Sequence, residues 1–256
     1  MFTRAIVRPP SSSFSNGLTT VDLGKPDLAK ALTQHELYCE ALKSCGLSLI
    51  TLPGDHRYPD STFVEDTAVL TERCAVLTRP GADSRRREVE SIQPLLAEFF
   101  DKVESIKPPG RVDGGDVCGA GDHFFIGVSN RTNEEGAKQL AEILWTYGYT
   151  SEFVDVRNVK SILHLKSGLA YIGQKQMIVI DELVRLSEFK GYEVVTVKRG
   201  EEYAANCVEV NNRVLVAAGY PSLSQGLKDR GFETIELEMS EFQKMDGGLS
   251  CLSLRF

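Results

Sequence analysis

The sequence lacks the features of several large protein classes. No run is long and apolar enough to cross a membrane, and Arg4 and Arg8 interrupt the N-terminal segment where a secretory signal needs an unbroken apolar stretch. Basic residues do not exceed acidic ones, since 29 Lys and Arg stand against 36 Asp and Glu and the net charge is -7. This balance argues against a general nucleic-acid-binding surface. We therefore expect a cytoplasmic protein with no nucleic-acid and no membrane partner.

The six cysteines contain no Cys-x-x-Cys pair, which disfavours a zinc ribbon or a thioredoxin-type redox site. In a reducing compartment we expect free thiols, mostly buried as small apolar side chains. The 42% hydrophobic and 25% charged residues are ordinary for a globular protein. A chain of 256 residues can hold one large core or two small ones. The repeat described next favours one domain over residues 1–256.

One order of elements recurs along the chain: a strand, a tight turn, a second strand, a helix and a third strand. The clearest unit begins near Asp116, continues through a strand at 123–128 and ends with a strand at 151–156. Thr132 and Glu135 have the spacing of a capping box, which predicts the start of the intervening helix. Three similar units surround this one in the sequence.

The helices expected in those three units differ in how clearly the sequence marks them. In the first, a long helix is predicted over 84–100, and in the third a short helix near 182–189. In the fourth, Ser222 and Gln225 repeat the capping-box spacing, and the turn Asn211-Asn212 separates the first two strands.

A fifth unit is split between the two ends of the chain. Its second strand is expected at 3–8, its helix at 26–45 and its third strand at 47–52, while 251–256 supplies the first strand. An open solenoid needs polar capping repeats, whereas these ends complement each other. The sequence therefore predicts an α/β fold, a five-bladed α/β propeller of ββαβ units with pseudo-five-fold symmetry, closed by the C-terminal strand. A non-repeating α/β sandwich is the alternative.

Unusual polar residues occupy the start of the first strand in every unit. In a ring, equivalent positions lie at equal distances from the axis, so these side chains are expected to converge on one pocket. Taken singly, each has a structural interpretation, as a core histidine, a buried cysteine or a turn-capping aspartate. Their shared place in the repeat favours a functional site. The five positions are Glu65-Asp66, Asp113 to Asp116, His164, Asn206 and Cys251.

This set of groups suits covalent chemistry on a guanidinium cation. Carboxylates hold a guanidinium through paired, charge-assisted hydrogen bonds. Cysteine attacks as a thiolate, and a cation beside Cys251 would lower its pKa. His164 can protonate a leaving amine and then deprotonate water. Together they support a route through a cysteine-bound amidine intermediate.

Six short motifs spread over nearly the whole chain extend this interpretation. They are FVED at 63–66, DGGDV at 113–117, NRTN at 130–133, LHLKS at 163–167, ANC at 205–207 and DGGLSC at 246–251. In these motifs the chain resembles the dimethylarginine dimethylaminohydrolases of the guanidine-modifying, or pentein, superfamily of five-bladed α/β propellers. The pairing of the LHLKS and DGGLSC segments is the most specific part of the resemblance.

The resemblance implies a dimethylargininase, a hydrolase that converts free asymmetric dimethylarginine or monomethylarginine to citrulline and a methylamine. It implies Cys251 as the nucleophile and His164 as the general acid and base. Asp113 matches a carboxylate that assists the histidine and bonds the guanidinium, at a position where some members carry Glu.

The resemblance also implies a set of substrate-binding residues. Arg85 and Arg131 would hold the carboxylate of the free amino acid, and Asp66 the unmethylated side of the guanidinium. The loop 10–25 would act as a lid over the site. The full implied set is Leu18, Asp60, Glu65, Asp66, Arg85, Arg131, Met245 and Asp246.

Alternatives remain at two levels. An arginine deiminase-type hydrolase would release ammonia, but such enzymes typically carry an inserted helical domain for which the unit spacing leaves no room. A non-catalytic propeller binding protein has no need for cysteine, histidine and carboxylates at convergent positions. We expect no cofactor and no resident metal, and a zinc ion on Cys251 and His164 would act as an inhibitor. The expected partner is a small methylated arginine, and a homodimer stays open.

Overall fold

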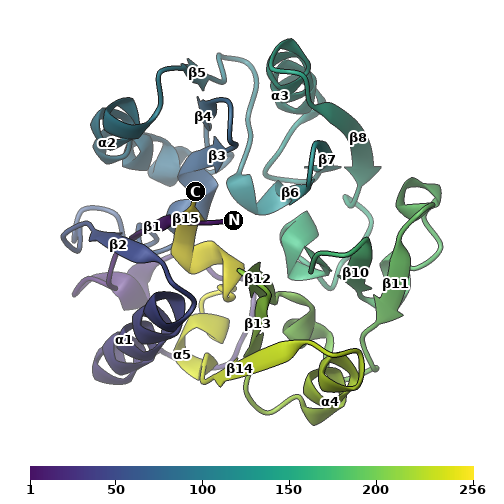
Figure 1. The fold of residues 1–256 in the computed structure, drawn as a ribbon. Helices are drawn as coiled ribbons and strands as arrows, with labels where there is room; N and C mark the ends of the chain where they lie inside the picture. The colour runs from purple at the N-terminus through teal and green to yellow at the C-terminus, as the bar shows by residue number, and fades with distance from the viewer.

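Five separate three-stranded sheets form the ring of this protein in a computed structural model that describes residues 1–256. The sheets stand around a central axis, and the longer helices lie on the outside of the ring (Figure 1). In each sheet the first strand pairs antiparallel with the second, and the second pairs parallel with the third. The prediction of a five-bladed α/β propeller of ββαβ units is confirmed.

Four of the five blades are continuous in sequence, and each carries its crossover between the second and third strands. The first and second blades are β3 (Ala68–Leu70), β4 (Ala75–Leu77) and β5 (Val103–Ser105), then β6 (Val117–Ala120), β7 (His123–Val128) and β8 (Thr150–Asp155). The third and fourth are β9 (Leu169–Tyr171), β10 (Gln176–Val179) and β11 (Glu193–Thr196), then β12 (Val208–Val210), β13 (Arg213–Ala217) and β14 (Glu233–Leu237).

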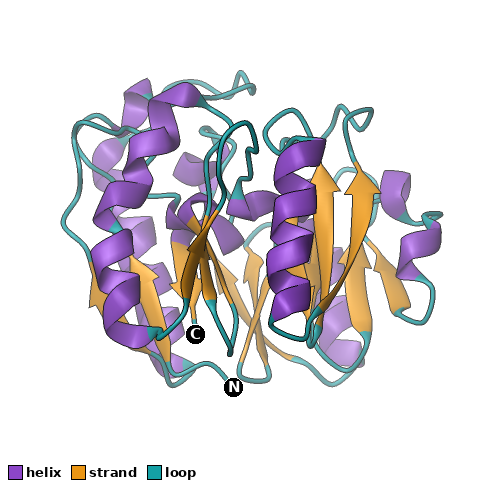
Figure 2. Ribbon diagram, turned by 90° about the horizontal axis from the view of Figure 1, so that it is seen from above, coloured by secondary structure: helices purple, strands orange, loops and turns teal.

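The fifth blade joins the two ends of the chain, as the sequence predicts. Strand β1 (Arg4–Val7) lies between β15 (Ser253–Arg255) and β2 (Ser48–Thr51), and α1 (Leu28–Ser44) connects β1 to β2. The Phe256 carbonyl accepts hydrogen bonds from the Thr3 and Arg4 amides, both at 2.8 Å. The C-terminal strand therefore closes the ring, and Figure 2 shows both termini at the same end of it.

Two of the expected helices are broken in the structure. The segment 84–100 is a 3-10 helix, η3 (Asp83–Ser91), followed by α2 (Gln93–Phe99). Pro94 explains the break, since proline donates no backbone hydrogen bond and is tolerated only in the first turn of a helix. The segment near 182–189 is two 3-10 turns, η6 (Asp181–Leu183) and η7 (Ser187–Phe189), separated by extended backbone at Leu186.

Both capping-box predictions were wrong in detail. Helix α3 (Glu134–Thr146) is capped by Asn133, whose side chain accepts from the Gly136 amide at 2.9 Å. Thr132 is fully buried and accepts from the Asp113 amide, so it serves the site and not the helix.

Helix α4 (Pro221–Asp229) likewise begins without a side-chain cap of its own, so neither Ser222 nor Gln225 plays the expected part. Proline at its first position needs no hydrogen-bond acceptor. The Glu201 carboxylate accepts from the amides of Ser222 and Leu223 instead. The remaining helix, α5 (Ser240–Gln243), lies just before the C-terminal segment of the site.

A single 3-10 turn precedes the first strand of every blade. The sequence prediction placed the polar positions at strand starts, whereas they lie in or beside these turns. Cys251, for example, lies in the last turn, and β15 begins only at Ser253. The five turns are η2 (Val64–Thr67), η4 (Gly114–Asp116), η5 (Leu165–Ser167), η8 (Glu202–Ala205) and η9 (Ser250–Leu252).

Buried apolar side chains fill the spaces between neighbouring blades. Phe125 of the second blade, for example, packs against Phe189 and Tyr192 of the third, with ring centroids 5.4 and 5.5 Å apart. All six cysteines are free thiols and four of them are buried, as expected. No helix has the length and apolar character needed to cross a lipid bilayer.

Candidate active site

The 3-10 turns surround one pocket near the axis of the ring. All the predicted site residues line it except Asp113 and Glu65, which lie directly behind the lining. Three lining residues were not singled out from the sequence, although each belongs to a motif noted there: Phe63, Leu163 and Gly247. The pocket therefore brings together residues that are up to 233 positions apart, from Leu18 to Cys251.

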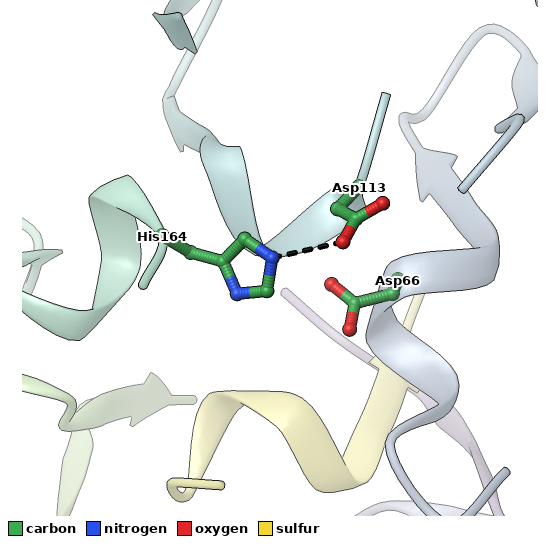
Figure 3. A group of neighbouring side chains, drawn as sticks. All are labelled: Asp66, Asp113 and His164. Atoms are coloured by element: carbon green, nitrogen blue, oxygen red, sulfur yellow. Dashed lines mark hydrogen bonds and ion pairs between the residues drawn. The ribbon is translucent and has the colours of Figure 1, made fainter. Parts of the chain in front are cut away.

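His164 and Asp113 form a buried pair at the side of the pocket. The imidazole Nε2 lies 2.9 Å from Asp113 Oδ2, and the other carboxylate oxygen accepts from the Gly81 amide at 2.7 Å. Asp113 has no exposed surface, and His164 is 5% exposed. Figure 3 shows the carboxylates of Asp113 and Asp66 both directed toward the imidazole ring. The ring orientation is thus set by a carboxylate that is itself fixed by backbone.

The charge of His164 follows from these neighbours. Burial by itself lowers the pKa of the imidazole, but the carboxylates of Asp66, Asp113 and Asp116 outweigh it and raise that pKa to about 9. At neutral pH the side chain is therefore an imidazolium, bonded through Nε2 to the Asp113 carboxylate.

Cys251 lies in the turn η9, is partly exposed and lines the same pocket as this histidine. Burial of the sulfur, with the nearby carboxylates of Glu65 and Asp66, raises the pKa of the thiol to about 12. Lys166 acts in the opposite direction but does not outweigh them. At neutral pH the Cys251 side chain is consequently a neutral thiol, and a cation entering the pocket would favour the thiolate.

Asp66 and Arg85 form a second buried pair in the pocket wall. The Arg85 guanidinium lies 2.5 Å from Asp66 Oδ2, and its remaining donors reach Glu88 and the backbone carbonyls of Asp60 and Phe63. Burial raises the pKa of the Asp66 carboxyl, but His164 and Arg85 outweigh it and lower that pKa to about 2. Asp66 is therefore a fixed negative charge.

Glu88 is a member of the site that sequence reasoning missed. It lies three residues after Arg85 in η3, and i, i+3 side chains lie on the same side of a 3-10 helix. Its carboxylate oxygen is 2.8 Å from the guanidinium, and its side chain is 2% exposed. The i, i+3 spacing of opposite charges was the available signal.

Arg131 reaches the pocket from the loop before α3. Its guanidinium lies 3.9 Å from Asp113 Oδ2, and the side chain is 17% exposed. Glu134, three residues further along the chain, pairs with Arg157 and not with Arg131. Compared with Arg85, Arg131 has more of its donors free for a ligand.

Hydrogen bonds link the five turns to one another around the axis. The Asp66 carboxylate accepts from the Gly115 amide at 2.9 Å, which joins the first blade to the second. Asp116 accepts from the Leu165 amide at 2.9 Å, which joins the second to the third. Asn206 donates to the Lys166 carbonyl at 2.9 Å, which joins the third to the fourth.

Ser250 supplies the remaining links, from the fourth blade to the fifth and from the fifth back to the first. Its amide donates to Asn206 Oδ1 at 2.9 Å, and its hydroxyl donates to Glu65 Oε2 at 2.8 Å. Glu65, which was expected to bind substrate, has its other oxygen 2.6 Å from Lys166 Nζ and 3.5 Å from Arg255. In this structure Glu65 therefore links turns behind the pocket and does not line it.

The N-terminal loop covers the pocket. The Leu18 amide donates to both oxygens of Asp60, at 3.0 and 3.2 Å, and the Thr20 amide donates to Asp246 at 2.5 Å. A Cβ at Gly17 would collide with the Asp60 carboxylate, so the close approach of this loop requires glycine there. The expected lid is thus held down by two other members of the predicted set.

The acidic groups beside His164 also have the geometry of a cation site. One ligand atom each from Asp66, Asp113 and His164 lies within 4.8 Å of the others. A metal here would have to displace the proton from an imidazole whose pKa is about 9 and compete with the Arg85 cation for Asp66. The donor set fits a proton-bearing histidine better than a metal ligand.

Comparison with known proteins agrees with this geometry. Residues 23–252 match the family model described as N,N dimethylarginine dimethylhydrolase, eukaryotic. The N(G),N(G)-dimethylarginine dimethylaminohydrolase of Pseudomonas aeruginosa is 46% identical over the full length of both chains. That of Streptomyces coelicolor is 35% identical over 98% of this chain and 96% of its own.

Solved structures agree in shape as well. A cysteine-to-serine mutant of the Pseudomonas aeruginosa enzyme complexed with citrulline has a TM-score of 0.97 at 46% identity, covering 100% of both chains. The N-terminal domain of the cyanobacterial arginine dihydrolase ArgZ has a TM-score of 0.87 at 17% identity, over 100% of this chain and 97% of its own, which shows the fold alone. The family match and the full-length relatives show that this chain belongs to the dimethylarginine dimethylaminohydrolase family.

Proposed function

We propose that this protein hydrolyses free methylated arginines to citrulline and a methylamine, with residues 1–256 acting as one catalytic domain. The observation that carries the proposal is the convergence of a cysteine, a charged histidine and a fixed carboxylate on one pocket: Cys251, His164 and Asp66. The relative from Pseudomonas aeruginosa, whose structure holds citrulline, supports the nature of the product.

The pocket has a place for each end of such a substrate. Asp66, whose carboxylate stays ionised, would hold the guanidinium by charge-assisted hydrogen bonds. Arg131 would bind the α-carboxylate, because its guanidinium is the less engaged of the two in the pocket. Leu18 of the N-terminal loop, together with Asp60 and Met245, would enclose the amino-acid portion.

The first step would use the charge of the substrate itself. The bound guanidinium lowers the pKa of Cys251, the thiol proton passes to solvent, and the thiolate forms a bond to the guanidinium carbon. The bond from this carbon to the methylated nitrogen then breaks as His164 gives its proton to the departing amine. A cationic amidine remains on the sulfur, and the histidine is left neutral.

The second step would reverse the part played by His164. The neutral imidazole takes a proton from water, and the oxygen of this water bonds to the amidine carbon. The carbon–sulfur bond breaks, the Cys251 thiolate is released, and the loss of a proton leaves the urea group of citrulline. The Asp113 carboxylate, bonded to Nε2, would keep the imidazole ring oriented while these protons are exchanged.

A product assay tests this proposal. Purified protein is incubated with asymmetric dimethylarginine and, separately, with arginine, with no metal added. We expect citrulline and dimethylamine from the first and little product from the second. Citrulline and ammonia from arginine would instead indicate an arginine deiminase-type hydrolase. Folded protein that makes no product from either substrate would refute the proposed activity.

A further inference from the structure

Asn206 occupies a distinctive place behind the pocket. It follows the turn η8 of the fourth blade, is 6% exposed, and is absent from the lining. The other four blades each bring an acidic residue, His164 or Cys251 to this end of the ring, but the fourth brings an uncharged amide. No step of the proposed mechanism uses it.

The three hydrogen bonds of the Asn206 side chain run to both neighbouring turns. Its Nδ2 donates to the Lys166 carbonyl at 2.9 Å and to the Ser250 hydroxyl at 3.1 Å. Its Oδ1 accepts from the Ser250 amide at 2.9 Å. Lys166 follows His164 by two residues, and Ser250 directly precedes Cys251. One side chain therefore connects the turn of the proposed acid–base residue to the turn of the proposed nucleophile.

The space around Asn206 leaves this bridge little freedom. A Cβ placed on Gly248 would lie 2.5 Å from the Asn206 amide group, so glycine there permits a direct approach of the two segments. The Ser250 hydroxyl also donates to Glu65, which fixes it from the other side. Buried amides with all their partners in place hold the surrounding backbone rigidly.

We propose that Asn206 is a positioning residue that sets the distance between Cys251 and His164. The inference rests on the proposed function, because it concerns the two groups that act on the substrate in turn. A displacement of about 1 Å between reacting groups can lower a rate by about a hundredfold. The substrate-binding groups Arg131 and Asp60 belong to other segments, so their grip on the ligand does not depend on this bridge.

Asn211 supplies a matched control within the same hairpin. It lies at the far end of strand β12, and its side chain also makes three hydrogen bonds to neighbouring segments. Its Nδ2 donates to the carbonyls of Phe2 and Cys45, and its Oδ1 accepts from the Phe2 amide. The two asparagines therefore differ in which segments they join and not in the number of their bonds.

The test compares Asn206→Asp with Asn211→Asp, two changes of equal size and charge. In the first, an oxygen replaces the donor that faces the Lys166 carbonyl, so this link is lost while the Ser250 amide keeps its acceptor. We expect kcat to fall on the order of tenfold to a hundredfold while KM for asymmetric dimethylarginine and the affinity for citrulline change by less than about threefold. Asn211→Asp should lower the unfolding temperature but leave kcat unchanged.

The outcomes separate the two proposals. Wild-type protein without turnover would overturn the proposed function, and this inference with it. An active wild type with unchanged kcat in Asn206→Asp would overturn the positioning role alone, whatever happens to the unfolding temperature. If that variant does not fold, Asn206→Ser removes the same bridge without adding charge, and unchanged kcat there is equally decisive against the inference.

Discussion

The two ends of the ring use polar residues in opposite ways. At the end that carries the pocket, the side chains are buried and hydrogen-bonded to neighbouring blades, as with Asp66, Asp116 and Glu65. At the other end, the hairpin turns use residues with positive φ, such as Gly121 and Asn212. Figure 2 shows the chain termini at this second end.

The difference shows that the two ends of each blade meet different structural requirements. At the hairpin end, strand pairing needs only a tight reversal of the chain. Glycine and asparagine suit this reversal because they adopt left-handed backbone with little strain. At the pocket end, each turn also has to hold a reactive group and contact both neighbours. The candidate site residues thus lie at the end of each blade where a turn has the most contacts to make.

The largest expected effect is at the pocket end. Cys251→Ser removes the nucleophile, and we expect turnover of asymmetric dimethylarginine to fall on the order of a thousandfold or more. The fold and the binding of citrulline should stay intact, as circular dichroism and calorimetric titration would show. Undiminished turnover would eliminate the covalent route.

The next effect concerns pH. The folded pKa of His164 is raised from 6.5 to about 9, so its charged form stabilises the fold fully below pH 6.5, and this contribution is lost as the pH rises through 9. We expect about 3 kcal/mol of unfolding free energy to disappear over this window. Urea unfolding of wild type and His164→Gln at both limits measures it, and equal pH dependence in the two proteins would contradict the expectation.

A smaller effect is expected at the rim of the pocket. Arg131→Ala should raise KM for dimethylarginine by about tenfold to a hundredfold, the worth of a hydrogen bond to a charged group. A decarboxylated analogue is the control, because it lacks the group that Arg131 would bind. An equal loss for both compounds would argue against the carboxylate clamp.

The smallest effect is at the hairpin end. Gly121 has φ of +70° and open space where a Cβ would lie, so Gly121→Ala adds backbone strain and no collision. We expect a loss of about 1 kcal/mol in unfolding free energy and unchanged kcat. A large loss of activity here would show that the two ends of a blade are not independent.

Most of the ring was predictable because strands and hairpins leave clear local signals. The Asn211-Asn212 turn between two short strands marked the fourth blade correctly, and the complementary ends marked the closure. The helices were less predictable. Pro94 ends one helical pattern and starts another, and Asn133 outcompeted Thr132 as a cap because Thr132 is committed to Asp113. Contacts of this kind join distant parts of the chain, so a local sequence pattern does not reveal them.

The site was predictable as a set of residues but not as a network. The position of residues in the repeat, together with the family motifs, predicted most of the pocket-lining residues. The Glu65 side chain bonds Lys166 and Ser250. Which partners it finds depends on which blades are neighbours and on the direction in which the side chain points. The 3-10 turns were not expected either, since three or four residues are too few to show a period.

Hydrogen bonds from the Thr3 and Arg4 amides to the Phe256 carbonyl hold the two ends of the chain together. The order of the blades along the chain could therefore be changed without changing their arrangement in the ring. A peptide linker between the two ends would span a gap that backbone hydrogen bonds already bridge. The chain could then be opened at the hairpin between β9 and β10, where Gly173, Gln174 and Lys175 all have positive φ. Such a circular permutant would carry its blades in a different order along the chain yet keep Cys251 and His164 in the same pocket.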